Sequence, residues 1–186
     1  MKDIRIYDKI FGKGNWVVFN NHLTHKTSLT QEEIEEKKVF WESYFKKADK
    51  ISNINSLFNT IIDKLEALPV LDRKPDLINE DGSYNKEQVK KQLNVYNAMY
   101  KAALAKQKRD IATDLDLAII NAHEEALLKV DKFVLLANKM RDVLVQKVEN
   151  DEDISSVLEY LSNLNINSFD DLTDEKLQEI MDNLGM

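Results

Sequence analysis

The chain has 186 residues, of which 43% are hydrophobic and 32% are charged, which is enough apolar material for the core of one medium-sized domain. It contains no cysteine, and this excludes disulfides, thiolate metal sites and thiol catalysis. No stretch approaches the ~20 apolar residues of a membrane-spanning helix, and the N-terminus lacks the apolar segment of a secretory signal. We therefore expect a protein of the cytoplasm, or of a particle such as a virion assembled there, with no membrane partner.

The net charge of −7 is unevenly distributed along the chain. Residues 1–110 carry 20 Lys and Arg against 16 Asp and Glu, whereas residues 111–186 carry 6 against 17. A chain with one basic and one acidic end can dock head to tail with its own copies. A solvated acidic surface is the more common explanation of such a pattern.

Residues 1–28 are predicted to form an extended or hairpin-like arm rather than a helix. Ile4 and Ile6 alternate with charged residues, a turn signal follows at 12–15, and residues 16–19 favour a strand. Two strands alone are marginally stable in water. The arm is therefore expected to lie against the chain's own helices or against another subunit.

A helix is predicted after Thr30, because Thr30 and Glu33 have the spacing of a capping box. A seven-residue repeat of mainly apolar side chains then follows in two series, Ile34, Trp41, Ala48, Asn55, Ile62 and Tyr44, Ile51, Phe58, Leu65. Asn55 is the polar member of the first series, and Lys37 is the polar exception of the second. Ser52 and Asn53 are good N-cap residues, so the sequence allows either one long helix or two consecutive ones up to Pro69, where the segment is expected to end.

Two further long helices are predicted after a connector that contains a turn at Gly82. The first covers about 86–112 with Asn85 as its cap, and the second covers 114–149. Between them, Thr113 followed by Asp116 allows either a new helix start or a kink. A second apolar edge on the latter helix predicts that it is covered on more than one side and lies at the centre of a bundle; the edge comprises Leu117, Ile120, Leu128 and Leu135.

The acidic C-terminal tail is predicted to form a helix over about 154–163, a short turn at 169–172 and a last helix that ends at Gly185. Three stretches in it, Leu158–Leu161, Leu172–Leu177 and Leu184–Met186, together resemble the back half of a SAM-type helical module. The resemblance covers about thirty residues of a short Leu/Asp/Glu pattern, and no function is carried over from it.

No group of residues has the spacing of a catalytic, cofactor or metal site. The acidic residues around Gly82 miss the register of a calcium-binding loop by one position. His123 has no carboxylate three residues before it, as a helical di-metal site would require. We therefore predict a protein without enzymatic activity, cofactor or metal.

A basic cluster between Lys86 and Arg109, with Tyr96 and Tyr100, is the strongest indication of nucleic-acid binding. The two tyrosines, however, fall on the apolar face of the predicted helix, and the overall acidity opposes nonspecific binding. A solvated, lysine-rich face is the preferred interpretation.

Together these patterns predict an all-α fold, an elongated bundle of about four main helices (29–149) with an extended or hairpin-like N-terminal arm (1–28) and a small acidic helical tail (150–186). The expected function is that of a non-enzymatic assembly or adaptor subunit that binds copies of itself or other subunits. The residues predicted to bind these partners are the apolar ones of the arm and tail: Ile4, Ile6, Phe11, Trp16, Phe19, Phe169, Leu172 and Leu177.

Size and character fit a small subunit of a bacteriophage virion, such as a ring or connector near the portal. One alternative is a small regulatory binder, for example a phage- or plasmid-encoded inhibitor of a host or defence protein. A second alternative is an accessory factor that binds nucleic acid.

Overall fold

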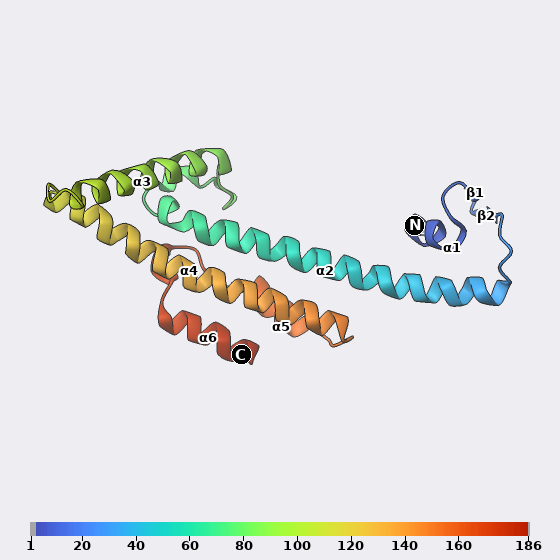
Figure 1. Cartoon of the computed structure of the whole chain (residues 1–186). Coiled ribbons are helices and arrows are strands. Elements are labelled where there is room, and N and C mark those ends of the chain that lie inside the picture. Colours follow the sequence, from blue (N-terminus) through green and yellow to red (C-terminus); the bar gives the residue numbers. More distant parts are fainter. Residues whose placement is uncertain (1–2, 186) are drawn as a thin grey trace. The chain divides into compact units, whose positions relative to one another are not determined.

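The structure is a computed structural model and describes residues 3–185 (Figure 1). The chain divides into two compact units, of which the first ends at Asn53 and the second begins at Ile54. The all-α class, the hairpin near the N-terminus and the small C-terminal helices are confirmed. The elements in chain order are α1 (Ile4–Phe11), β1 (Trp16–Phe19), β2 (His22–His25), α2 (Gln31–Leu71), the 3-10 turn η1 (Pro75–Leu77), α3 (Lys86–Gln107), α4 (Asp114–Glu149), α5 (Ser155–Ser162), the 3-10 turn η2 (Phe169–Asp171) and α6 (Asp174–Leu184).

The first residues form helix α1, so the prediction that no helix occurs in residues 1–28 is wrong. The Asp3 carboxylate caps this helix by accepting a hydrogen bond from the Arg5 backbone N–H, and Gly12 ends it at a φ of 81°. The alternation of Ile4 and Ile6 is too short to specify a strand. The apolar spacing from Ile6 to Phe11 is helical instead, and it buries Ile6, Tyr7, Ile10 and Phe11 on one face.

The hairpin is formed by β1 and β2 rather than by the segment around Ile4. The strands pair antiparallel, with Trp16 opposite His25 and Phe19 opposite His22. Asn20 and Asn21 make the two-residue turn, with φ angles of 46° and 63°. A hairpin turn with two positive φ angles matches the twist of the strands, and asparagine tolerates this conformation well.

Helix α2 is a single helix of 41 residues, which settles the choice between one helix and two. It begins as predicted, because the Thr30 hydroxyl accepts from the Glu33 N–H at 3.3 Å and the Glu33 carboxylate accepts from the Thr30 N–H at 2.7 Å. Asn53 therefore does not start a new helix.

Pro69 lies inside the last turn of α2, so the prediction that it ends the segment is wrong. A proline inside a helix removes one hydrogen bond and crowds the carbonyl four residues before it, but the helical hydrogen bonds continue after Pro69. The N–H of Asp72 bonds to the Leu68 carbonyl at 3.0 Å, and that of Lys74 bonds to the Val70 carbonyl at 2.9 Å.

The first unit has its own small hydrophobic core. The buried face of α1 packs with Ile34 of α2, and Trp16, Leu23, Trp41 and Phe45 cover this cluster in part. A hairpin and a short helix gain their stability from such packing rather than from local propensity.

The second unit is built around α4. Helices α3 and α4 are joined by a tight turn and run back along each other, while α6 lies against α4 (Figure 1). The caps are those that the sequence predicts: Asn85 accepts from the Gln88 N–H, and Thr113 and Asp116 form a reciprocal capping box. The Lys106 ammonium lies 2.7 Å from the Asp116 carboxylate and links the two helices.

The acidic tail packs onto this bundle. Its residues Leu172 and Ile180 are fully buried, and Ile180 lines the same small cavity as Phe58 of α2 and Phe133 of α4. The Phe169 N–H also donates to the Asp72 carboxylate at 2.7 Å. The tail is therefore part of the second unit.

One prediction about α4 is wrong within the described part of the chain. Of its second apolar edge only Ile120 is buried, whereas Leu117, Leu128 and Leu135 are exposed. The helix is thus covered along one edge but not along both. Among residues 3–185, no helix is both long and apolar enough to span a membrane.

Candidate partner-binding surfaces

Three of the predicted partner-binding residues are inside the chain. Ile6, Phe11 and Leu172 are buried by the chain itself, because α1 and the tail each turn their apolar face inward. These side chains are not part of the surface that a partner meets in this conformation.

The other five predicted residues are exposed or half-buried, in two separate places. Ile4 and Phe19 are exposed in the first unit, and Trp16 is half-buried with its indole N–H donating to Asp8 at 2.9 Å. Phe169 and Leu177 are half-buried in the second unit. The predicted residues therefore do not form one site.

A more extensive aromatic surface lies on α2 in the first unit. Four consecutive ring contacts join Phe40, Trp41, Tyr44 and Phe45, with centroids between 5.1 and 5.9 Å apart. Trp41 and Phe45 pack on the core of this unit, while Phe40 and Tyr44 are 61% and 53% exposed. We call these four residues the aromatic ridge.

The heptad repeat does not indicate this ridge as a surface. Trp41 and Tyr44 belong to the heptad series, where each is expected to pack against another helix. The pair Phe40–Tyr44, spaced four residues apart beside Trp41, is the signal that was available. On β1 the side chains of Val17 and Phe19 are exposed as well.

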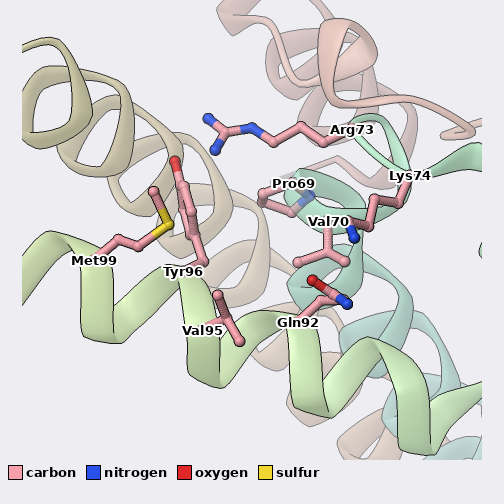
Figure 2. Close-up of a pocket in the computed structure, with 8 residues that line it drawn as sticks. All are labelled: Pro69, Val70, Arg73, Lys74, Gln92, Val95, Tyr96 and Met99. Atoms are coloured by element: carbon pink, nitrogen blue, oxygen red, sulfur yellow. The ribbon is translucent and has the colours of Figure 1, made fainter. Parts of the chain in front are cut away.

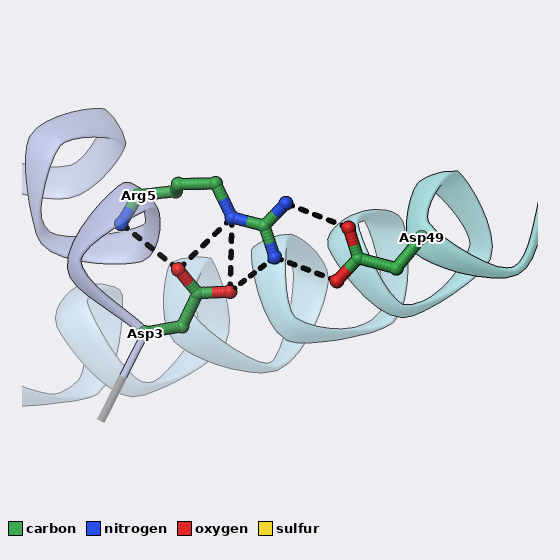
Figure 3. Close-up of polar contacts among 3 residues, drawn as sticks. All are labelled: Asp3, Arg5 and Asp49. Carbon is green, nitrogen blue, oxygen red and sulfur yellow. Dashed lines mark hydrogen bonds and ion pairs between the residues drawn. The ribbon is translucent and has the colours of Figure 1, made fainter. Parts of the chain in front are cut away.

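Arg5 fixes α1 onto α2 beside the ridge (Figure 3). Its guanidinium donates two hydrogen bonds of 2.7 Å to the Asp49 carboxylate and three of 2.6 to 3.1 Å to the Asp3 carboxylate. Its Cζ also lies 4.6 Å from the centroid of the Phe45 ring. These hydrogen bonds raise the pKa of Arg5 and lower the pKa values of both carboxyl groups. Because the pairs are exposed, they contribute to the orientation of α1 more than to stability.

The second unit carries a groove of about 280 Å³ between the end of α2 and α3, which we call the α2–α3 groove (Figure 2). Its apolar lining is Pro69, Val70, Val95, Tyr96 and Met99, and its polar lining is Arg73, Lys74 and Gln92. Val95 and Met99 are about half exposed at the rim. A half-exposed methionine is typical of surfaces that adapt to a partner.

The two cations of this groove have no acidic partner among residues 3–185. The Arg73 Cζ lies 4.2 Å from the centroid of the Tyr96 ring. A guanidinium stacked in this way keeps its N–H donors free in its plane, where they can bind a carboxylate. Cations are also favourable near the C-terminus of a helix, but that role does not require the apolar groove beside them.

Under the groove, His123 of α4 is packed between two tyrosines. It is only 5% exposed, and its ring lies 4.1 Å from that of Tyr100 and 4.8 Å from that of Tyr96. The imidazole is therefore part of the packing between α3 and α4 and not of the surface. Burial, aided by the charge of Arg73, lowers the pKa of His123, and its Nδ1 and the Tyr96 hydroxyl have no hydrogen-bond partner within the described chain.

Several cations of the basic cluster between Lys86 and Arg109 are paired. Lys86 lies 2.8 Å from Asp63, and Lys91 lies 3.2 Å from Glu87. The side chain of Lys106 is committed to Asp116, whose pKa it lowers to about 2 together with hydrogen bonds from Thr113. Over residues 3–185, no cluster of three or more His, Cys, Asp and Glu side chains is placed to hold a metal ion.

Comparisons with family models, with curated proteins and with solved structures found no match to this chain.

Proposed function

We propose that the chain is a non-enzymatic subunit of a multi-protein assembly and that the aromatic ridge is its main contact surface. The observation that carries this proposal is the ridge itself, where two rings are held by the core and two neighbouring rings stand exposed. Aromatic side chains supply large contact areas and dominate the energetics of protein interfaces.

The ridge is also suitably positioned for a stable contact. Trp41 and Phe45 are held in place by the core of the first unit, and Arg5 ties α1 to α2 next to them. A surface held rigid before binding loses less conformational entropy when a partner orders it. The exposed side chains of Val17 and Phe19 on β1 add apolar area within the same unit.

The test is the mass of the protein in solution, measured by native mass spectrometry and light scattering. We expect the wild type to form an oligomer and the double variant Phe40→Ser/Tyr44→Ser to dissociate at least tenfold more readily. Ile111→Ser is the matched control, because Ile111 is as exposed as Phe40, 61% in each case, but lies in the second unit.

A wild type that is monomeric, and that captures the same partners from its source as the double variant does, would overturn the proposal. A salt-sensitive one-to-one complex with a single target would favour the regulatory binder instead. Within the assembly class, our specific proposal is a ring or connector of a phage particle. A closed oligomer of fixed copy number supports that choice, and a dimer or an open filament contradicts it.

A further inference from the structure

We propose that the α2–α3 groove of one copy binds the exposed side of helix α4 of a second copy, in a head-to-tail contact. This inference rests on the proposed function, because it names one contact by which the subunits assemble. Both surfaces belong to the second unit, so the contact does not use the aromatic ridge and can be tested separately from it.

The α3 wall of the groove has the form that accepts a helix. Val95 and Met99 stand half-exposed at the rim, above an apolar floor. Together with Gln92 and Tyr96 they follow the i, i+3, i+4, i+7 spacing along α3, so their side chains form one face. Such a face in an apolar groove is typical of sites that bind the apolar side of a partner helix.

The α2 wall adds two positive charges. Arg73 and Lys74 extend from the end of α2 in different directions along the groove (Figure 2). Neither has an acidic partner among residues 3–185. The occupant that fits the groove is therefore a helix with leucine-like and acidic side chains on the same side.

Helix α4 has such a side. Glu124, Leu128, Asp131 and Leu135 are spaced at i, i+4, i+7 and i+11, so they form a single stripe along the helix. All four are exposed, Leu128 by 61% and Leu135 by 58%. We call these four residues the α4 stripe, on which acids and leucines alternate.

The stripe is not covered or neutralised by its own copy. Leu128 and Leu135 belong to the second apolar edge of α4, which the sequence predicts to be covered and which is exposed in the single chain. Asp131 has no cationic partner among residues 3–185. Glu124 accepts a hydrogen bond from the Tyr100 hydroxyl at 3.2 Å, which leaves its charge without a cation.

The groove and the stripe are thus complementary in both respects, because each supplies the charges that the other lacks and both are apolar between these charges. Lys139 lies on the α6 side of the stripe, whereas Glu124 and Asp131 lie on its other side on the helical wheel. The cations of the groove are therefore expected to approach the stripe from the side away from α6.

The distribution of charge along the chain agrees with this contact. The groove belongs to the part of the sequence with a net charge of +4, and α4 belongs to the part with −11. No residue of the stripe lines the groove of its own copy. The contact is therefore heterologous, and it leaves one free surface of each kind on every pair. Such contacts continue until a ring closes or a filament grows, so they predict oligomers larger than a dimer.

The test is an exchange of charge between two full-length variants. In Arg73→Glu/Lys74→Glu the groove repels the stripe, and in Glu124→Lys/Asp131→Lys the stripe repels the groove. Each variant alone is expected to weaken self-association at least tenfold in sedimentation velocity. An equimolar mixture is expected to restore association, because the contacts between unlike variants are again between opposite charges. Raising the salt concentration is expected to weaken the wild type and the mixture alike.

A third variant tests the apolar part of the contact. Leu128→Ser/Leu135→Ser changes two exposed side chains, so its circular dichroism is expected to match that of the wild type while its self-association weakens at least tenfold. The control for net charge is Lys90→Glu/Lys101→Glu, which alters exposed residues on the opposite face of α3 from the groove. It is expected to associate like the wild type.

Unchanged association in the two charge variants, or a mixture that stays dissociated, would overturn this inference. If the charge variants associate like the wild type while Phe40→Ser/Tyr44→Ser does not, the proposed function stands and only the contact between groove and stripe is rejected. A wild type that is monomeric at every concentration would reject this contact as well.

Discussion

Phe58 provides the most direct test of how the second unit is held together. Its side chain is 0% exposed in the core where α2 meets α4, α5 and α6, and the void beside it measures only about 20 Å³. Phe58→Ala therefore removes apolar contacts from a closely packed part of the core. The lost transfer free energy is about 3 kcal/mol, and the unfilled cavity raises the expected loss to about 3–5 kcal/mol. A loss of that size is a large part of the roughly 5–15 kcal/mol that stabilises an ordinary domain.

The assay is urea unfolding followed by far-UV circular dichroism and by tryptophan fluorescence. Both tryptophans, Trp16 and Trp41, lie in the first unit, so fluorescence reports that unit while circular dichroism is dominated by the helices of the second. We expect the dichroism midpoint of Phe58→Ala to fall clearly and the fluorescence midpoint to move much less. Phe40→Ala is the matched control, because its ring is 61% exposed and its loss should stay within about 0.5 kcal/mol.

Two results would refute this reasoning. A loss below about 1 kcal/mol in Phe58→Ala would mean that the core closes around the missing ring. A loss in Phe40→Ala equal to that in Phe58→Ala would mean that burial does not set the contribution of these side chains. Phe58→Leu, which keeps most of the volume, should cost less than Phe58→Ala in either case.

Three further predictions concern charged and titratable groups. The pKa of Asp116 is lowered to about 2 in the folded chain. The ionised carboxylate therefore stabilises the fold above about pH 4, and this stabilisation is lost as the pH falls toward 2. In Asp116→Asn the free energy of unfolding should decrease less over this pH range than in the wild type. The pKa of His123 is lowered by burial, so the free energy of unfolding should decrease as the pH falls below about 6.5, and this decrease should be smaller in His123→Phe if the imidazole is its source. Arg5→Lys keeps the charge but not the two-pronged hydrogen bonds to Asp49, so hydrogen exchange should become faster in α1 and stay unchanged in α4; equal rates in α1 would contradict the orienting role.

The longest helix segments were predictable because their signals are local. Thr113 and Asp116 form the capping box that the sequence predicts, and α4 spans Asp114–Glu149 as expected. A capping residue acts on backbone groups only two or three positions away, so the printed sequence contains all the information that this interaction needs.

Helix α1 was not predictable in the same way. It has only eight residues, and an isolated helix of that length is unstable in water. Its stability comes from Ile34 and Trp41, which α2 brings to it from more than twenty positions away. The same long-range packing explains why Ile6 and Phe11 are inside the chain although they were expected at a surface.

The sequence predicts that apolar side chains form surfaces that bind partners, but it does not predict where in the structure these surfaces lie. Apolar residues in the arm and tail indicated contact with partners, but the sequence does not show which of them the chain covers itself. The α2–α3 groove depends on Pro69 continuing the helix, which brings Arg73 beside Tyr96. The residues next to Pro69 in the sequence do not indicate that α2 continues past this proline.

The two asparagines at the tip of the hairpin set the register in which β1 pairs with β2. With a turn of two residues, Trp16 pairs with His25 and turns toward the α1 core, while the odd-numbered Val17 and Phe19 point the other way. Neighbouring residues of a strand point to opposite faces. Inserting one residue before Trp16 therefore leaves every β1 side chain on its present face. Inserting one within the strand after Trp16 moves each later side chain of β1 to the opposite face. Insertions and deletions should therefore be better tolerated in the loop before Trp16 than between Trp16 and Phe19.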